Sequence, residues 1–373
     1  MQISQAVNGL NWCHVFPSSG DGEVFALGVS SLDSFQKKDL YFSIKNELVR
    51  RGYTVLAVGQ RELLGKFSKD KGDMVAETIA SGPKLGKALY RFFAKYRPDA
   101  FFIRSKVLKL FKEVKPCAFL TQWYVPLILD VVRKCGITSV LWCMDDPMII
   151  EERWFYGDWF RYASNFDFVY TISKSALPFY KEAGATSVNW LPLYFDPYLN
   201  GEEIGIECVI SFVGNYFSDR LPACERILFP LIQKFEKDVH IFGSGWNETV
   251  VKRASLHRAI PRSALKSVFL GSKINLNIHR ESAYKYPALN FRTFEITGFG
   301  GFEMVEYVKG LEELFEIGKE LVAPKSSQEA IELAQHYLEN DEQRLKIASN
   351  GQKRVLNEHT ISHRIDSILK QIK

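Results

Sequence analysis

The segment Ser211–Arg220, SFVGNYFSDR, indicates how the second half of the chain folds. It begins inside a short apolar run, Cys208–Val213, which has the length of a buried strand. Gly214 follows directly, and a glycine there lets the backbone turn sharply and leaves amide groups free to face an anion. A helix is expected from Leu221 onward, so Arg220 stands at its start, within reach of a phosphate group.

Three segments downstream also carry glycine or polar residues where a predicted strand ends or a helix begins. They are IFGSGW (Ile241–Trp246), INLNIHR (Ile274–Arg280) and NFRTFE (Asn290–Glu295). The carboxyl ends of parallel strands meet at one edge of a sheet, and ligands bind there. We therefore expect one ligand site that contains Gly214, Arg220, Gly243, Gly245, His279, Arg280, Asn290, Arg292 and Glu295. Taken singly, each charged residue also fits a surface salt bridge, and His279 fits a structural hydrogen bond.

The chain as a whole alternates short apolar runs with longer amphipathic ones, which is typical of an α/β fold. In the first half, strands are expected at 54–58, 100–103, 118–121, 139–143 and 168–171, and a helix at 38–51. The segment 194–206 contains two glycines, a proline and an asparagine, as a linker would. This pattern predicts two Rossmann-like domains with parallel sheets that face a cleft, residues 1–200 and residues 207–358.

Composition excludes several classes of protein. The chain has 373 residues, of which 46% are hydrophobic and 24% charged, so it is neither disordered nor a disulfide scaffold. Its six cysteines form no C-x-x-C pair, which argues against a zinc knuckle and favours a reducing, cytoplasmic compartment. No Lys or Arg precedes Lys37, so a signal peptide is not expected, and the longest apolar stretch, 116–132, is interrupted by polar residues.

Residues 37–115 are strongly basic, with 19 Lys and Arg against 8 Asp and Glu. Within them, Lys84–Arg97 (KLGKALYRFFAKYR) has an aromatic, apolar side and a basic side at helical spacing. Such a helix binds an anionic membrane surface, which would make the protein peripheral at the inner membrane face. The alternative is an ordinary helix that packs on the core with its charges in solvent. No recognised nucleic-acid-binding motif is present, so a nucleic acid is not the expected partner.

The order of these motifs resembles a known family. From FVGNYFSDR through NFRTFEITGFGGF to the closing RVLNEHTISHRI, residues 208–365 resemble the nucleotide-binding domain of GT-B glycosyltransferases. The group typified by the spore-maturation CgeB-like proteins is the most similar. The first half resembles it mainly at Leu141–Pro147, LWCMDDP. The resemblance implies a GT-B fold, a donor site in the second domain, an acceptor site in the first, and a C-terminal helix, 359–373, that packs back on the first domain.

The resemblance also assigns roles to single residues. Related retaining enzymes hold the donor diphosphate with a Gly-Arg pair and a lysine five positions later. Here Asn215 occupies the first charged slot and Arg220 the second, so only Arg220 keeps the positive charge. The relatives also carry two glutamates eight positions apart, and the later one, which bonds the ribose, corresponds to Glu295. Pro287 occupies the earlier slot and Glu281 is out of register, which leaves the stereochemistry open, with retention favoured.

The chemistry of glycosyl transfer gives an independent reason for these residue types. A nucleoside diphosphate leaves with negative charge, which a metal, cations or helix N-termini must stabilise. The sequence has no D-x-D element, and it has Arg220, Arg280 and Arg292, so we expect a metal-independent mechanism with no cofactor. Asp145 and Asp146 end a predicted strand of the first domain, where a carboxylate either accepts the acceptor's proton or caps the next helix. The sequence does not distinguish between them.

The sequence therefore predicts a glycosyltransferase that uses a UDP-, GDP- or dTDP-linked sugar as donor. Its acceptor is a hydroxyl of a glycan, of a lipid-linked molecule or of a protein. The alternatives are a nucleotide-sugar 2-epimerase of the same fold, which needs no acceptor, and a non-catalytic assembly or coat protein. Asn215 and Pro287, at positions where relatives carry charge, favour the last of these.

Overall fold

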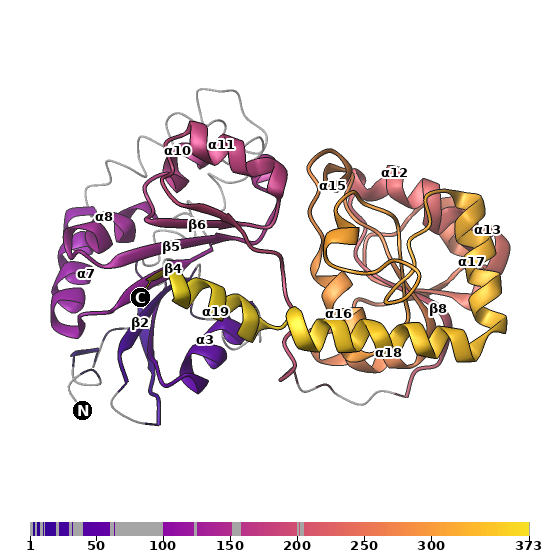
Figure 1. Ribbon diagram of the computed structural model, residues 1–373, viewed down its shortest axis with the longest axis horizontal. Helices are drawn as coiled ribbons and strands as arrows, with labels where there is room; N and C mark the ends of the chain where they lie inside the picture. Colours follow the sequence, from indigo (N-terminus) through magenta and orange to yellow (C-terminus); the bar gives the residue numbers. More distant parts are fainter. Residues whose placement is uncertain are drawn as a thin grey trace.

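The computed structural model describes residues 12–19, 22–29, 40–59, 100–122, 125–150, 158–199 and 205–372, with a few isolated positions between them. These residues form two α/β lobes that lie side by side, each built on its own sheet (Figure 1). The basic segment Lys84–Arg97 lies outside the described residues.

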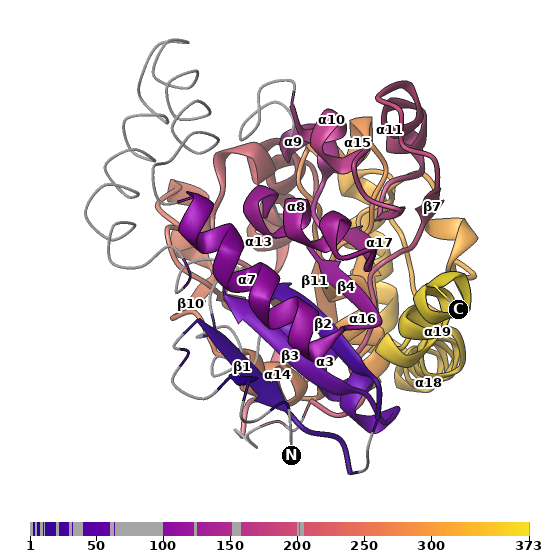
Figure 2. The same cartoon turned by 90° about the vertical axis from the view of Figure 1, so that its left-hand side faces the viewer.

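The first lobe contains a seven-stranded sheet in the order β1-β3-β2-β4-β5-β6-β7, in which only β1 is antiparallel. Its inner strands are buried on both faces, as the continuous apolar runs predict. Helices α3 and α19 cover one face, and α7, α8 and α11 cover the other, with α7 in front of the strands in Figure 2. The strands are β1 Cys13–Phe16, β2 Val24–Val29, β3 Thr54–Gly59, β4 Ala118–Thr121, β5 Thr138–Cys143, β6 Phe168–Thr171 and β7 Val188–Trp190. The helices are α3 Leu40–Arg50, α7 Ala100–Val114, α8 Pro126–Lys134, α9 Pro147–Ile149, α10 Trp159–Ala163 and α11 Leu177–Glu182.

The second lobe contains a five-stranded, wholly parallel sheet in the order β10-β9-β8-β11-β12. Helices α13 and α17 pack on one face, and α14 and α16 pack on the other. The strands are β8 Cys208–Val213, β9 Val239–Phe242, β10 Ser255–His257, β11 Ser272–Asn277 and β12 Glu303–Val305. The helices are α12 Leu221–Ala223, α13 Phe229–Phe235, α14 Leu265–Leu270, α15 Ser282–Lys285, α16 Phe291–Phe299, α17 Ser327–Glu339 and α18 Asp341–Glu358. The last helix of the chain, α19 Ile361–Ile372, packs on the first lobe.

The strand expected at 100–103 is wrong, because these residues form the first turn of α7. The apolar side chains Ile103, Val107, Leu110, Phe111 and Val114 recur at helical spacing and are buried against the sheet. No glycine or proline separates residue 100 from this periodic run, so the helix extends back through it. The described edge strands β1 and β10 have only four and three residues, and their sequences did not indicate them.

The chain passes between the lobes twice. Residues 191–199 leave the first sheet, and after α18 the chain returns so that α19 packs on α3 of the first lobe (Figure 1). Arg51 forms an ion pair with Asp366 at this contact. Arg364 is buried and donates hydrogen bonds to the carbonyl oxygens of Pro192 and Leu193 at 2.9–3.1 Å. The two crossings are therefore bonded to each other.

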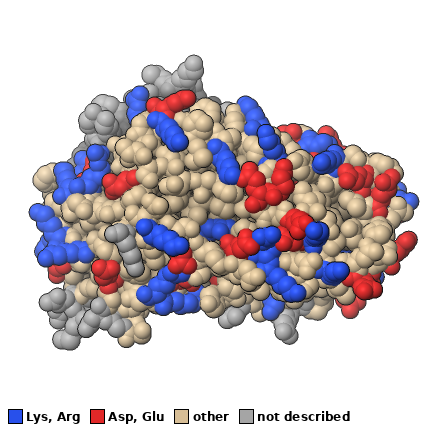
Figure 3. All heavy atoms as spheres, viewed as in Figure 1, with Lys and Arg blue, Asp and Glu red and all other residues tan. Residues whose placement is uncertain are grey.

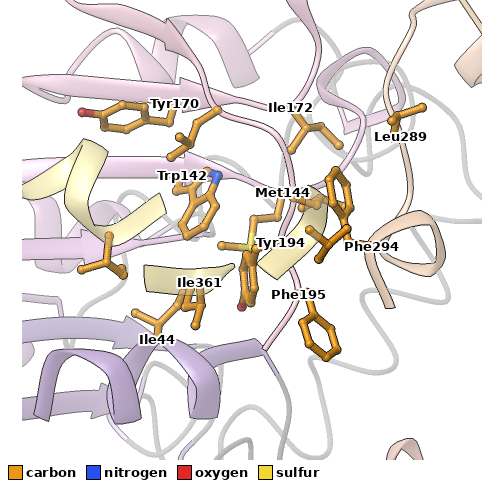
Figure 4. Close-up of a cluster of buried hydrophobic side chains, with 14 of the residues drawn as sticks. Ile44, Trp142, Met144, Tyr170, Ile172, Tyr194, Phe195, Leu289, Phe294 and Ile361 are labelled. Atoms are coloured by element: carbon orange, nitrogen blue, oxygen red, sulfur yellow. The ribbon is translucent and has the colours of Figure 1, made fainter. Parts of the chain in front are cut away.

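One cluster of buried hydrophobic side chains is shared by both lobes (Figure 4). It extends from Trp142 on β5 through Tyr194 in the crossing segment to α16. The Tyr194 ring meets Phe291 edge-on at 5.4 Å, and Phe195 meets Phe299 edge-on at 4.9 Å. Gly298 allows this approach, because a Cβ there would lie 2.4–2.7 Å from the Phe195 ring. The packing between the lobes therefore fixes how the ends of the two sheets face each other.

Candidate functional site

A cavity of about 370 Å³ lies between the lobes, beyond the carboxyl ends of strands from both sheets. The first lobe contributes the segment after β5 and the residue after β6, and the second contributes the segment from the end of β11 to the start of α16. Most lining side chains are aliphatic, and the polar ones gather where the two lobes meet. The lining residues are Met144, Asp145, Asp146, Ile149, Ile150, Ile172, Leu193, His279, Arg280, Ser282, Ala283, Ala288, Leu289, Asn290 and Phe291.

The two adjacent aspartates of the first lobe differ in their contacts. Asp146 caps the short helix α9, since its Oδ1 accepts a hydrogen bond from the Met148 amide at 2.9 Å. The Asp145 side chain has accessible surface within the cavity, but the protein around it removes part of its surrounding water. This desolvation raises the pKa of its carboxyl. The positive charge of Arg280, across the cavity, acts in the opposite direction on that pKa. Helix capping accounts for Asp146 Oδ1, although burial raises the pKa of the Asp146 carboxyl as well, and Asp145 has no capping role.

The glycine turns after β8 and β9 pack together as one unit. The Gly214 amide donates to the Phe242 carbonyl at 2.9 Å, and Trp246 Nε1 donates to the Gly214 carbonyl at 2.9 Å. A Cβ on Gly243 would lie 2.1 Å from the Gly214 carbonyl oxygen, so only glycine fits. Asn215 Oδ1 accepts hydrogen bonds from the amide and hydroxyl of Ser244, between Gly243 and Gly245, at 3.0 and 3.1 Å. Asn215 thus holds the two turns together.

Three arginines converge beside these turns. Burial lowers the pKa of Arg220, and the nearby charges of Arg280 and Arg292 lower it further. The Phe217 ring lies under both Arg220 and Arg280, at 5.5 and 4.6 Å from their guanidinium carbons. Arg220 Nη1 donates to the Asn215 carbonyl at 2.9 Å, whereas its Nε is buried with no hydrogen-bond partner among the described residues. Cations held this close together repel each other, and a bound anion relieves that repulsion.

His279 follows β11 and is 1% exposed. Its Nε2 accepts a hydrogen bond from the Asn290 amide at 3.2 Å, so the neutral ring carries its hydrogen on Nδ1. Within the described structure, that Nδ1 is buried and has no partner. Burial lowers the pKa of His279 to about 3, with a further contribution from the charge of Arg220. The ring is therefore a neutral hydrogen-bond donor at the wall of the cavity.

A buried polar network fixes the start of α16 beside His279. Asn290 caps the helix by accepting from the Thr293 amide at 3.2 Å, and its side-chain amide donates to Asn277 Oδ1 at 2.9 Å. Asn277 in turn donates to Glu303 Oε1 at 2.8 Å. Burial raises the pKa of Glu303 well above its ordinary value, which favours the protonated carboxyl. The position of the Asn290 amide, and with it the tautomer of His279, depends on this network.

The two glutamates considered for the donor site, Glu295 and Glu281, both form ion pairs with arginines. Glu295 is 1% exposed and pairs with Arg262 and Arg292. Glu281 forms an ion pair with Arg226 at 3.0 Å. Arg226 also donates to Glu306 at 2.8 Å, behind the loop that carries His279 and Arg280. No local sequence pattern marks Arg226, Arg262 or Glu303 as site residues, because each acts through a partner far away in the sequence.

Comparisons with known proteins agree with this architecture. Residues 222–370 match the family model described as glycosyl transferase-like. The chain resembles sucrose-phosphate synthase from Thermosynechococcus elongatus with a TM-score of 0.62 and 11% identity, over 94% of this chain and 99% of that chain. It resembles HepE from Anabaena, solved in complex with UDP and glucose, with a TM-score of 0.59 and 13% identity over the same shares of the two chains. An Escherichia coli trehalose-6-phosphate structure bound with UDP-2-fluoro glucose matches with a TM-score of 0.59, 10% identity and the same coverage. No curated protein matches the chain in sequence.

The chain has the GT-B fold. This confirms the predicted architecture of two α/β units with facing parallel sheets. The family match begins in α12 and runs to α19, so it covers most of the second lobe and the returning helix. It supports the glycosyltransferase resemblance at this level, and the narrower likeness to CgeB-like proteins stays a prediction. Within the described residues, no three side chains of His, Cys, Asp or Glu are arranged to hold a metal ion.

Proposed function

We propose that this GT-B protein transfers a sugar from a nucleoside diphosphate sugar to a hydroxyl acceptor. The observation that carries the proposal is a set of buried nitrogen donors without partners in the described structure: Arg220 Nε, His279 Nδ1 and Arg292 Nε. A buried donor without a partner costs about 1–3 kcal/mol, so such groups gather only where a ligand satisfies them. His279 follows β11, Arg292 lies in the first turn of α16, and both lie close to Arg220.

The second domain, 207–358, is proposed to bind the donor. Gly214, Gly243 and Gly245 let the backbone approach the nucleotide, and Arg220, Arg280 and Arg292 supply positive charge for its diphosphate. His279 donates its Nδ1 hydrogen to an oxygen of the bound nucleotide sugar, and the hydrogen bond from the Asn290 amide to Nε2 holds the imidazole ring in place. UDP is the first nucleotide to test, because HepE was solved with UDP and glucose. GDP and dTDP are the alternatives.

The first domain, 1–200, is proposed to bind the acceptor and to supply Asp145. As the bond from the anomeric carbon to the diphosphate breaks, the arginines stabilise the negative charge on the departing nucleotide. The acceptor oxygen forms the new bond to the anomeric carbon, and Asp145 accepts its proton. We expect this chemistry to need no metal ion. Retention of the anomeric configuration, which the resemblance to retaining enzymes implies, requires that the acceptor oxygen attack from the same face that the diphosphate leaves.

A thermal-shift screen against UDP, GDP, dTDP and their sugar conjugates tests the donor site. A ligand that binds only the native state at 100 times its dissociation constant stabilises it by about 2.7 kcal/mol, so one nucleotide should raise the melting temperature clearly. Arg220→Ala should abolish that shift, whereas Arg354→Ala, on α18, should retain it. A folded protein that responds to none of these nucleotides would contradict the proposal and support a non-catalytic role. Nucleotide release without any acceptor would instead indicate an epimerase.

We also propose a cytoplasmic protein whose first lobe contacts an anionic membrane, which suits a lipid-linked acceptor. No helix in the described part of the chain is long and apolar enough to cross a bilayer. On α7, however, Phe101 and Phe102 are 75% and 66% exposed, and Lys106, Lys109 and Lys112 follow them on the surface. Figure 3 shows more Lys and Arg than Asp and Glu side chains on the visible face of the first lobe, scattered among uncharged residues, and mixed charges over the second lobe. Apolar and basic side chains together favour an interfacial position.

Vesicle sedimentation tests this membrane contact. The protein should sediment with vesicles that contain phosphatidylserine and remain in the supernatant with neutral phosphatidylcholine vesicles. Phe101→Ser with Phe102→Ser should lower the affinity for these vesicles about 30-fold, since each exposed ring contributes about 1 kcal/mol on burial. Phe179→Ser, at an exposed ring on α11, is the control and should bind as the wild type does. Equal sedimentation of all variants, or none of the wild type, would contradict the contact.

A further inference from the structure

Glu295 has no oxygen open to a ligand in this structure. It lies in the second turn of α16 and is 1% exposed. Its Oε1 accepts a hydrogen bond from Arg262 Nε at 3.1 Å, and its Oε2 pairs with Arg292 Nη1. Each carboxylate oxygen can accept a second hydrogen bond, but the Glu295 side chain is only 2% exposed, so a ribose hydroxyl reaches it only if Arg262 or Arg292 moves aside. The geometry therefore disagrees with the ribose role that the family resemblance implies for Glu295.

Arg262 is held by one end of its guanidinium and free at the other. It lies in a 3₁₀ turn, Arg262–Ala264, that leads into α14, next to the start of α16. Nε binds Glu295, whereas Nη1 is buried and has no partner among the described residues. The guanidinium carbon lies 6.0 Å from the centre of the Phe291 ring, and Phe291 lines the cavity between the lobes. An unpartnered buried donor beside the cavity indicates that a ligand completes its hydrogen bonding.

We propose that Arg262 binds the diphosphate of the donor, and that Glu295 is a positioning residue that holds Arg262 and Arg292 and does not touch the ribose. This inference rests on the proposed donor site and adds a ligand to it. Arginine suits the role because its planar fork keeps Nε on the glutamate while Nη1 binds a phosphate oxygen. Lysine presents its three N–H donors from one nitrogen, so it cannot hold the glutamate and a phosphate oxygen at the two separate positions that Nε and Nη1 occupy. The phosphates are the anions that a nucleoside diphosphate offers near pH 7.

The first test measures the affinity of the full-length protein for UDP and for inorganic pyrophosphate by isothermal titration calorimetry. Arg262→Gln and Arg262→Lys should each weaken both ligands about 10- to 100-fold, because a charge-assisted hydrogen bond is lost. The control is Arg354→Gln, which removes an arginine of α18 that pairs with Glu320 at 2.9 Å. This variant should bind both ligands as the wild type does. Unchanged UDP and pyrophosphate affinities in both Arg262 variants would overturn the inference. The melting temperature of each variant shows whether it is folded, and Arg262→Lys keeps the charge if Arg262→Gln does not fold.

The second test decides whether Glu295 touches the ribose. UDP and 2′,3′-dideoxy-UDP are titrated into the wild type and into Glu295→Gln. For a positioning residue, the ratio of the two affinities is the same in both proteins, because the effects of independent changes multiply. This ratio does not depend on whether removing the glutamate charge strengthens or weakens anion binding as a whole. For a ribose ligand, the penalty for removing the hydroxyls shrinks about tenfold or more in Glu295→Gln, and that result would overturn the inference.

The two proposals fail in different ways. If the wild type binds neither UDP nor any other nucleoside diphosphate, the donor site itself is wrong, and the role of Arg262 is wrong with it. If the wild type binds UDP while the Arg262 variants bind it equally well, the donor site stands and only the further inference is overturned.

Discussion

Asp145→Asn is expected to lower the rate of sugar transfer about 10²- to 10⁴-fold, the range for loss of a general base. Asp145 faces the cavity beyond the end of β5, and burial raises the pKa of its carboxyl. A carboxylate with a raised pKa accepts a proton better at neutral pH, and asparagine cannot accept one at all. UDP affinity should stay within about twofold, because the donor is held by the other lobe. The measurement is the initial rate of UDP release from the UDP-sugar that stabilises the protein, together with UDP titration.

Asp146→Asn is the matched control for that experiment. Asparagine caps helices about as well as aspartate does, so the cap on the Met148 amide should survive and stability should change little. The transfer rate of Asp146→Asn should therefore remain close to that of the wild type. The assignment fails if Asp145→Asn keeps its rate, or if Asp146→Asn loses as much. The rate of the wild type should also rise with pH as Asp145 loses its proton.

The sequence was most informative in the second lobe. The strand expected at 208–213 lies where its short apolar run placed it, between Glu207 and Gly214. Gly214, Asn290 and Arg220 lie at the expected ends of elements. Strand β10 was missed because Ser255–His257 is half exposed and follows no alternation. The extended conformation of this three-residue edge strand depends on its pairing with β9, and no local sequence pattern predicts that pairing.

The site was harder to predict than the fold, because its residues act through partners. The sequence placed Asp145, His279, Arg280 and Asn290 near the ends of predicted strands or the start of a helix, where ligands bind in parallel sheets. All four line the same cavity between the lobes. The sequence could not show that Asp146 is a cap, since both aspartates precede the same proline. Arg262 is 33 positions before Glu295, and only the packing of α14 beside α16 brings them together. Glu303 looks like a charged residue in sequence, yet burial raises the pKa of its carboxyl well above the ordinary value.

Acidification should destabilise the protein through His279. Its pKa is about 3 in the folded state and 6.5 when unperturbed. Between these values the unfolded chain binds a proton that the folded state does not, so stability falls as pH falls, by about 1.4 kcal/mol per pH unit. Glu303 acts in the opposite direction, because its raised pKa means that the folded state holds a proton that the unfolded chain releases above pH 4.5. Since His359 also has a lowered pKa, of about 4, the curve of the wild type alone cannot isolate His279.

The comparison with His279→Gln isolates this contribution. Glutamine offers an oxygen to the Asn290 amide but does not titrate, so its unfolding free energy should depend less on pH. Urea unfolding between pH 7 and pH 4 should show the free energy of the wild type falling more steeply, by about 1.4 kcal/mol per unit below pH 6. His336→Gln, at an exposed histidine, should follow the wild-type slope. Equal slopes in wild type and His279→Gln would mean that His279 is charged in the folded state, and its role as a neutral donor through Nδ1 would then be wrong.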